Sequence, residues 1–411
     1  MRILLIHQYY LEEGDPGGSR FNEMTQVWAE RGHQVTVVCG MLNYLTGKIP
    51  EKYNGFRKHE SIYYNGVRVI RAKVGSGYNA SFFKRLLNLF SFVYYGLLAV
   101  RKESDNHDVI IATSPPLFVG YMAYRLSQKL NIPYVFEVRD LWPESAISTG
   151  VLKSPLIIKL SFWLEKLSYN HASLINVLTP AFKKILINDK KIPEDKIIYI
   201  PNAVDFSVAE SSKNLDIPLI KDLRNRFDFL AVYIGAHGVA NHLEQVLETA
   251  KLVKEEKIAI LLIGDGMRKI ELKEQAAKEK IANVIFIDSV PKRDVYAYIS
   301  QVDVGISCLQ KNNTFKSVYS NKTFDYMACS KPVVMAIDGI SRELIEKAKC
   351  GLYAEPENAG EIASVLIRYK NDCDLHRRHG INGYAYVKKY FDRMNLANSY
   401  IEQINNKVFS V

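Results

Sequence analysis

The chain has 411 residues, a length that favours two domains of about 200 residues each over a single domain. Hydrophobic residues make up 48% of it, which excludes a globally disordered chain. The net charge of +10 points to an anionic partner: nucleic acid, an anionic bilayer or a phosphorylated substrate. The five cysteines include no C-x-x-C pair and no metal-ligand spacing, so we expect free thiols in a reducing compartment.

The first forty residues predict a strand, a loop, a helix and a second strand. Ile3–Ile6 is apolar, and His7 and Gln8 end this run before it reaches the length of a signal peptide, so we expect a buried strand of a cytoplasmic protein. Apolar residues share one face of a predicted helix at Arg20–Glu30, and Val35–Val38 forms the next strand. This alternation is typical of parallel α/β sheets.

The alternation continues along the chain in two series. Further strands of the first series are predicted at Val109–Ala112, Tyr134–Val138 and Ser173–Leu178. The second series has strands at Leu230–Ile234, Ile258–Ile263, Val284–Ile287, Val304–Ser307 and Val333–Ile337, with helices at Leu243–Glu255 and Met267–Lys280. We therefore predict an α/β protein with two Rossmann-like domains facing a cleft. Ligands of open parallel sheets bind at the carboxyl ends of the strands.

Two breaks in the pattern mark the predicted domain boundaries. The segment Ile200–Asp205 separates the two series, and an aromatic break at Tyr390–Asp392 interrupts the last helices. We predict an N-terminal Rossmann-like domain at residues 1–200 and a second at 201–385. The C-terminal helix, residues 386–411, is expected to pack back on the first domain.

The segment from Ser61 to Lys102 contains basic residues but no acidic ones. An uncharged helix is predicted at Leu86–Val100, with Phe90 and Tyr94 on one apolar stripe and the basic residues Lys84, Arg85, Arg101 and Lys102 at its ends. The helix is too short to span a bilayer, and its basic ends and aromatic body suit a helix lying in a membrane interface. A core helix with a basic rim is the alternative.

Two motifs of the first series follow predicted strands. Gly17 and Gly18 lie in the loop after the first strand, and glycine lets backbone N–H groups approach an anion closely. Arg139 and Asp140 follow the strand that ends at Val138, and charged groups crowded at a strand end indicate a functional site. An ordinary loop and a structural ion pair are the alternatives.

The first strand of the second series is also followed by a polar motif. Gly235, His237 and Asn241 form it, and a turn of backbone N–H groups, a histidine and the next helix N-terminus together suit a phosphate. A capping role for His237 is the alternative. Asp372 and Asp374 lie in a polar helical stretch instead of after a strand, and no other cluster has metal-ligand spacing, so no metal site is expected.

The segment Ser317–Pro332 carries the most informative pattern. A polar loop at Ser317–Lys322 leads into a short amphipathic helix that carries Asp325, and an apolar strand follows. Backbone N–H groups at the helix start favour an anion, and a carboxylate one turn further in suits a ribose diol. A nucleoside diphosphate sugar presents both groups. A solvated helix face is the alternative for Asp325.

Residues 325–333, DYMACSKPV, resemble the nucleotide-sugar motif of the retaining glycosyltransferases of family 4. That family has an acidic residue where this chain has Ser317. Residues 321–327 are closer to a subgroup that builds bacterial surface polysaccharides on lipid carriers and is similar to the N-acetyl-L-fucosamine transferases of O-antigen synthesis. The Gly17-Gly18 pair and residues 32–37, GHQVTV, also match, so the resemblance extends over nearly the whole chain.

The resemblance implies the two-domain architecture called GT-B and a set of site residues. Gly17 and Gly18 would border the donor diphosphate and the acceptor, and backbone near Val290 would border the base. Catalysis would involve Arg139, Asp140 and His237. The remaining donor contacts would come from Gly235, Asn241, Ser317, Ser320, Asn321, Lys322 and Asp325.

We therefore expect a cytoplasmic enzyme at the inner face of the membrane. It would transfer an N-acetylated hexosamine or deoxyhexosamine from a UDP-sugar to a polyprenyl-diphosphate-linked saccharide, with retention and without a cofactor. The first domain would bind the acceptor and the second the nucleotide sugar. A UDP-sugar epimerase of the same architecture and, because of the charge, a nucleic-acid-binding protein are the alternatives; nucleic acid is not an expected partner of the transferase.

Overall fold

The computed structural model describes residues 1–12, 15, 20–43, 47–63, 65–75, 82–101, 107–212 and 215–409. The chain divides into two compact units, one formed by Met1–Pro201 with Met394–Val411 and the other by Asn202–Arg393. The chain returns to the first unit at Met394 and not at residue 386, because helix α15 (Cys373–Tyr390) packs on α12 (Asn321–Ala328) of the second unit.

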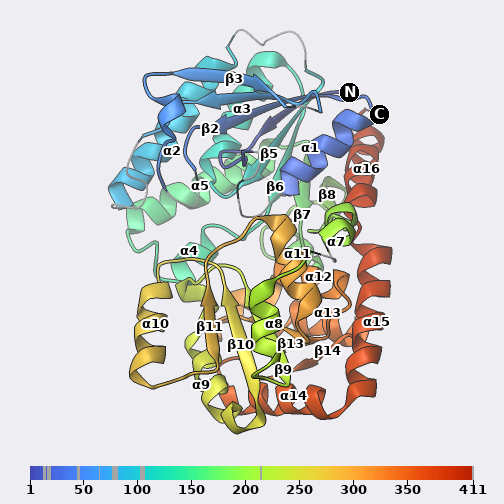
Figure 1. Ribbon diagram of the computed structural model, residues 1–411. Helices are drawn as coiled ribbons and strands as arrows, with labels where there is room; N and C mark the ends of the chain where they lie inside the picture. The colour runs from blue at the N-terminus through green and yellow to red at the C-terminus, as the bar shows by residue number, and fades with distance from the viewer. Residues whose placement is uncertain are drawn as a thin grey trace. The chain divides into compact units, whose positions relative to one another are not determined.

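The first unit contains a sheet with the strand order β3-β4-β2-β1-β5-β6-β7-β8 (Figure 1). Its strands are β1 (Arg2–Ile6), β2 (Gln34–Gly40), β3 (Lys58–Ile62), β4 (Arg68–Ala72), β5 (Val109–Ser114), β6 (Tyr134–Val138), β7 (Leu174–Val177) and β8 (Ile197–Tyr199). Neighbouring strands are parallel except β3 and β4, which are antiparallel. The sequence did not predict β3, β4 and β8; β3 is a partly exposed edge strand and β8 is very short.

Helices cover both faces of this sheet. On one face, α1 (Arg20–Glu30) packs with α16 (Arg393–Ile404), and the Trp28 indole N–H donates a hydrogen bond to the Ala397 carbonyl (2.8 Å). The predicted return of the C-terminal helix to the first domain is thus confirmed. On the other face lie α2 (Phe82–Ala99), α3 (Phe118–Leu130) and α5 (Pro155–His171). Two short helices, α4 (Glu144–Ser148) and α6 (Pro180–Asn188), complete the connections.

The second unit contains a parallel sheet with the order β11-β10-β9-β12-β13-β14. Its strands are β9 (Phe229–Ile234), β10 (Ile258–Ile263), β11 (Val284–Ile287), β12 (Val304–Cys308), β13 (Val333–Ala336) and β14 (Gly351–Tyr353). Side chains of β9 alternate between two cores: Val232 packs on one face of the sheet and Tyr233 on the other. The prediction of two α/β domains is confirmed.

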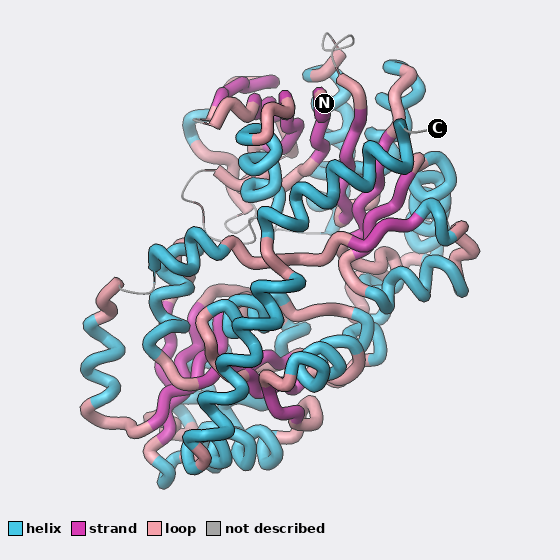
Figure 2. The backbone as a smooth tube through the Cα atoms, turned by 90° about the vertical axis from the view of Figure 1, so that its right-hand side faces the viewer, coloured by secondary structure: helices cyan, strands magenta, loops and turns pink. Residues whose placement is uncertain are grey.

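Helices sandwich this second sheet, as the tube in Figure 2 also shows. They are α7 (Phe206–Ser212), α8 (Pro218–Arg224), α9 (Glu244–Leu252), α10 (Lys269–Lys278), α11 (Lys292–Gln301), α12, α13 (Ile340–Ala348), α14 (Ala359–Asn371) and α15. The strands progress in one direction from β9 to β11 and in the other from β12 to β14. The order therefore reverses between β9 and β12, and ligands of open α/β sheets bind outside the carboxyl ends of strands at such a switch point.

Candidate functional site

The turn after β9 brings two of the predicted motifs together. Gly235 has φ 146°, a conformation that favours glycine, and a Cβ there would lie 3.3 Å from Cε of Lys322. The ammonium group of Lys322 lies 4.8 Å from the ring centroid of Tyr233 and 3.4 Å from the Ser320 hydroxyl. A cation from the start of α12 therefore lies against the turn at the switch point of the sheet.

Lys322 is half-buried, and burial is the main reason that its pKa is lowered. Cys308 and Asp325 act in the opposite direction. Lys322 was predicted to lie in a loop, but it is the second residue of α12, and a 3₁₀-helix (Asn313–Ser317) ends where the predicted loop begins. A partly desolvated ammonium at a helix N-terminus gains from an anionic ligand.

The carboxylate of Asp325 is buried and holds two partners from α11. The ammonium of Lys292 lies 2.7 Å from each carboxylate oxygen, and the Tyr296 hydroxyl donates to Oδ1 at 3.1 Å. A solvated helix face, the alternative for Asp325, is therefore wrong. The carboxylate is fixed in one orientation, one helical turn after the residues at the start of α12.

The polar residues before Asp325 shape the loop. The Ser317 hydroxyl donates to the Thr314 carbonyl, and the Ser320 N–H donates to the Ser341 hydroxyl. The Asn321 side chain accepts a hydrogen bond of 2.6 Å from the side chain of Asn202, the first residue of the second unit. The structure thus gives Ser317, Ser320 and Asn321 supporting contacts that fix the helix start.

The position of His237 does not match the role predicted for its side chain. The residue is fully buried, its ring packs near Tyr233 and Phe286, and a Cβ on Gly264 would lie 3.4 Å from its Nε2. Burial, assisted by Lys269, lowers the pKa of His237 to about 4. An enclosed, neutral imidazole does not offer a phosphate the charged contact that the sequence predicted, and Lys322 offers one in its place.

Two further predicted donor contacts lie in the second unit. The Asn241 side chain accepts a hydrogen bond from the Gly238 N–H (3.4 Å), so it closes the turn after β9. Val290 is partly buried against the core and lies two residues before Lys292. Val290 thus lies just before α11, the helix whose Lys292 and Tyr296 contact Asp325.

The predicted catalytic pair of the first unit follows β6. The Arg139 N–H donates to the Ser114 carbonyl (3.1 Å), and Asp140 accepts from the Ser145 hydroxyl (2.9 Å). Burial raises the pKa of Asp140. His7, which follows β1, is buried, and burial and then the charge of Arg139 hold its pKa well below its usual range. His7 was not predicted as a site residue because its sequence context indicates only the end of a strand.

Several predicted residues of the first unit cannot be compared with the structure. Gly17, Gly18 and Lys102 lie outside the described residues, as do the side chains of Lys84 and Arg85. Within α2, Phe90 and Tyr94 are exposed, whereas the neighbouring Phe92 is buried. The helix therefore has both a core face and an exposed apolar stripe.

A buried network of polar side chains, which the sequence did not predict, contacts the last residues of the first unit before the chain enters the second. Arg20 and Glu137 form a fully buried ion pair with two hydrogen bonds of 3.0 Å, and Asn176 donates to the same carboxylate at 2.9 Å. Arg20 also donates to the carbonyls of Ile200 and Pro201. The network fixes the last residues of the first unit against α1, β6 and β7.

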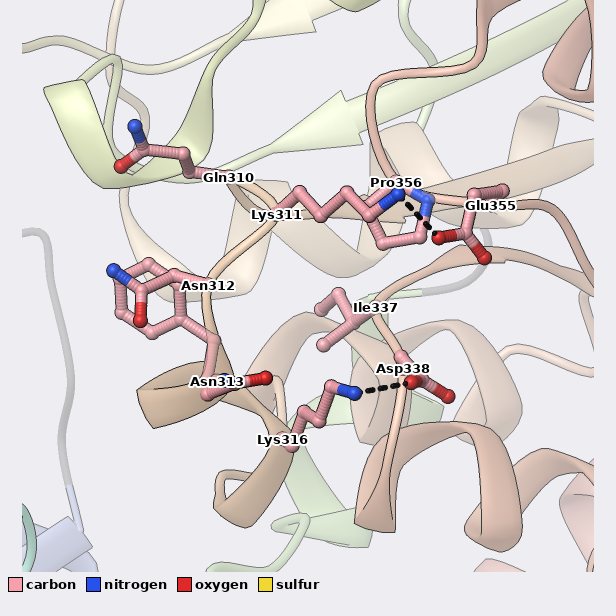
Figure 3. A pocket seen from close by; sticks show the side chains of 10 residues that line it. Gln310, Lys311, Asn312, Asn313, Lys316, Ile337, Asp338, Glu355 and Pro356 are labelled. Carbon is pink, nitrogen blue, oxygen red and sulfur yellow. Dashed lines mark ion pairs between the residues drawn. The ribbon is translucent and has the colours of Figure 1, made fainter.

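A pocket of about 340 Å³ lies beyond the carboxyl ends of β12 and β13. It is lined by Gln310, Lys311, Asn312, Asn313, Phe315, Lys316, Ile337, Asp338, Glu355 and Pro356, and Figure 3 shows its two ion pairs, Lys316 with Asp338 and Lys311 with Glu355. The 3₁₀-helix that borders it ends at Ser317. The pocket is thus next to the position where the family has an acidic residue.

The described residues contain no cluster of histidine, cysteine and carboxylate side chains that could hold a metal ion. The two acids of the D-x-D pair have other partners, since Asp372 caps α15 and Asp374 pairs with Arg377. Among all the residues that the structure describes, no helix is long and apolar enough to cross a membrane.

The sequence comparisons agree on one class of protein. Residues 17–203 match a glycosyl transferase 4-like domain, and residues 228–372 match the glycosyl transferases of group 1. The chain is 22% identical to WcaI of Escherichia coli K12, a candidate colanic acid biosynthesis glycosyl transferase, over 98% of this chain and 100% of WcaI. It is 24% identical to WbjE, a candidate glycosyltransferase of Pseudomonas aeruginosa, over 70% of this chain and 72% of WbjE.

The fold matches solved structures over the full chain. Anabaena HepE, in complex with UDP-glucose, has a TM-score of 0.72 at 17% identity and covers 99% of this chain and 100% of its own. The chain thus combines a glycosyl transferase 4-like domain with a group 1 glycosyl transferase domain, and it is a glycosyltransferase of GT-B architecture.

Proposed function

We propose that the enzyme transfers a sugar from a UDP-sugar to a polyprenyl-diphosphate-linked saccharide in the synthesis of a bacterial surface polysaccharide. The observation that carries this proposal is the placing of Lys322 against the Gly235 turn, one helical turn from the fixed carboxylate of Asp325. A cation and a carboxylate at the sheet's switch point suit a diphosphate and a ribose. The UDP-glucose bound in HepE and the colanic acid assignment of WcaI support the same substrate classes.

Each part of the donor has a proposed contact in the second unit. Lys322 and the backbone of the Gly235 turn would bind the diphosphate, Asp325 the ribose hydroxyls, and backbone near Val290 the base. The pocket beyond β12 offers amide and charged side chains to the hydroxyls of the sugar. We expect this sugar to be an N-acetylated hexosamine or deoxyhexosamine.

The proposed chemistry is a transfer with retention of anomeric configuration. The bond between the anomeric carbon and the diphosphate oxygen breaks and its electron pair stays on the diphosphate. The acceptor hydroxyl oxygen forms the new bond to the anomeric carbon, and its proton passes to the leaving diphosphate. Lys322 would stabilise the charge that develops on the leaving diphosphate, while Arg139 and Asp140 of the first unit would orient the sugar or the acceptor. No cofactor is needed for this reaction.

The proposed acceptor places the enzyme at the inner face of the cytoplasmic membrane. Polyprenyl diphosphates carry their saccharide at a bilayer surface, and the exposed stripe of α2 contains Phe90 and Tyr94 between basic ends. Apolar and basic groups together bind an anionic membrane interface. This proposal makes the first unit the acceptor-binding domain.

The test is a transfer assay with membrane lipid extract and a panel of labelled UDP-sugars. The panel would be chosen after a thermal-shift screen of nucleoside diphosphates, because a ligand that binds only the folded state raises apparent stability. Label that moves into the lipid fraction, with release of UDP and retention seen by NMR, would support the proposal. Conversion of the UDP-sugar to an isomer without any acceptor would instead indicate an epimerase.

A further inference from the structure

Helices α2, α3 and α5 form one layer on the first unit's sheet, opposite α1 (Figure 1). α3 contacts both of the other helices. The rings of Phe90 and Phe118 lie 4.7 Å apart between α2 and α3, and a Cβ on Gly120 of α3 would lie 2.0 Å from the Ser168 hydroxyl of α5. The three helices therefore present a continuous outer surface.

Two of these helices expose large apolar side chains. On α2 these are Leu87, Phe90, Tyr94 and Leu98, and on α5 they are Leu156, Leu160, Phe162 and Trp163. Leu156 is 77% exposed and Trp163 51% exposed, although both lie in a 17-residue helix whose other face is buried. The spacing of Leu156, Leu160 and Trp163 puts them on one side of α5. The stripe on α5 was not predicted from the sequence.

The same layer carries positive charge and no exposed acid. The sequences of α2 and α3 contain no Asp or Glu, in a chain that has 44 of them. The single acid of α5, Glu165, is buried and pairs with Lys190 at 2.8 Å. The exposed cations of α3 and α5 are Arg125, Lys129, Lys159 and Lys166.

We infer that the outer surface of α2, α3 and α5 lies on an anionic bilayer, with α5 as a second anchor that places Trp163 at the interface. Tryptophan and leucine gain from the boundary between headgroups and acyl chains, while lysine gains from anionic headgroups. A second copy of the chain fits this surface poorly, because two such layers would bring like charges together. The inference rests on the proposed function, because membrane binding by this surface would hold the first unit next to the lipid-linked acceptor of that reaction.

Two anchoring helices have a consequence that one helix alone lacks. A single amphipathic helix fixes one line of contact with a membrane, whereas α2 and α5, separated by α3, define a plane. The first unit would therefore keep one fixed orientation on the bilayer. Removing the α5 stripe should weaken binding even when α2 is intact.

The test is co-sedimentation of the full chain with vesicles of phosphatidylethanolamine and phosphatidylglycerol, compared with vesicles of phosphatidylcholine. Two variants remove the α5 contacts: Leu156→Ser with Trp163→Ser, and Lys159→Gln with Lys166→Gln. Matched controls remove equally exposed groups elsewhere, namely Leu252→Ser with Ile381→Ser, and Lys254→Gln with Lys278→Gln. Circular dichroism checks the fold of each, and Leu156→Gln with Leu160→Gln replaces the first variant if it unfolds.

We expect each α5 variant to lose about tenfold or more in partitioning onto the anionic vesicles, and the controls to bind like the wild type. UDP affinity, measured by calorimetry, should stay the same in all of them. Unchanged vesicle binding by a folded α5 variant would overturn the inference, as would equal binding to phosphatidylcholine. A wild-type dimer that the α5 variants abolish would assign the surface to a second copy. Vesicle binding without UDP binding would contradict the proposed function and leave this surface in place.

Discussion

The ammonium group of Lys292 lies 2.7 Å from both carboxylate oxygens of Asp325. Lys292 is the first residue of α11 and Asp325 lies in the middle of α12, so the ion pair joins the start of one helix to the middle of its neighbour. The Tyr296 hydroxyl adds a hydrogen bond to Oδ1. The carboxylate proposed to bind the ribose is therefore held in place before any ligand arrives, which lowers the entropy cost of binding.

Replacing Lys292 by Met should destabilise the second unit by about 1–3 kcal/mol, because the buried carboxylate of Asp325 loses its charged partner. Asp325→Asn should have a cost of similar size. Since the two groups bind each other, the double variant should cost clearly less than the sum of the single ones. Urea unfolding of the four proteins measures the coupling, and additive costs would show that the pair contributes nothing to stability.

Breaking the buried pair of Arg20 and Glu137 should have a larger effect. Arg20→Met leaves the buried Glu137 carboxylate with the Asn176 amide as a neutral hydrogen-bond donor but without its charged partner, at an expected cost of about 3–5 kcal/mol. Breaking the exposed pair of Arg342 and Glu346 with Arg342→Met should cost less than about 1 kcal/mol and serves as the control. Equal unfolding midpoints for the two variants would contradict the role given to the buried network.

His237 should make stability depend on pH. Its pKa falls from 6.5 in the unfolded chain to about 4 in the folded protein, so the unfolded state binds the extra proton between these values. Stability should therefore fall as the pH drops from 6.5 toward 4, by about 2–3 kcal/mol for this group. His237→Gln should lower stability at neutral pH but remove this part of the slope.

Urea unfolding at a series of pH values gives the difference between wild type and His237→Gln. The variant also tests whether the ring contacts phosphate, because such a contact would make the pH dependence of UDP affinity differ between the wild type and His237→Gln. If the stability of the wild type and of His237→Gln falls by the same amount as the pH drops, the ring of His237 is not held in a buried, neutral form in the folded protein.

Turnover should persist in excess EDTA. The described residues offer no cluster of metal ligands, and Asp372 and Asp374 have structural partners. Lys322 would supply the positive charge that a divalent cation supplies to a leaving diphosphate in other enzymes. Loss of activity in EDTA that Mg²⁺ or Mn²⁺ restores would show that this prediction is wrong.

The sequence predicted the strands well where they are central in a sheet. Strands β6 and β10, which lie inside their sheets, have the predicted bounds, because parallel strands covered on both faces are continuous apolar runs. The edge strand β3 alternates charged and polar residues such as Lys58 and Glu60, and this pattern does not identify a strand. On α5 the buried side includes Ser161, Glu165 and Ser168, whereas Leu156, Leu160 and Trp163 are exposed, so the apolar pattern of the sequence does not identify the exposed side.

The candidate site was predictable in part for a similar reason. Asp325 and Lys322 lie within one short motif, so their proximity follows from the chain itself. The partner Lys292 and the network of Arg20 with Glu137 join residues distant in the sequence, which periodicity does not reveal. The burial of His237 depends on the neighbouring turn, where a Cβ on Gly266 would lie 2.5 Å from the His237 carbonyl.

The most direct test of the donor site is calorimetric titration of UDP into the wild type and Asp325→Ala. The wild type should bind UDP, and the variant should lose about 1.5–3 kcal/mol of binding free energy, which is a loss of about tenfold to a hundredfold in affinity. Asp294→Ala, which removes a half-buried carboxylate of α11 outside the site, should bind UDP like the wild type. Equal affinity of wild type and folded Asp325→Ala would contradict the assignment of this carboxylate to the nucleotide.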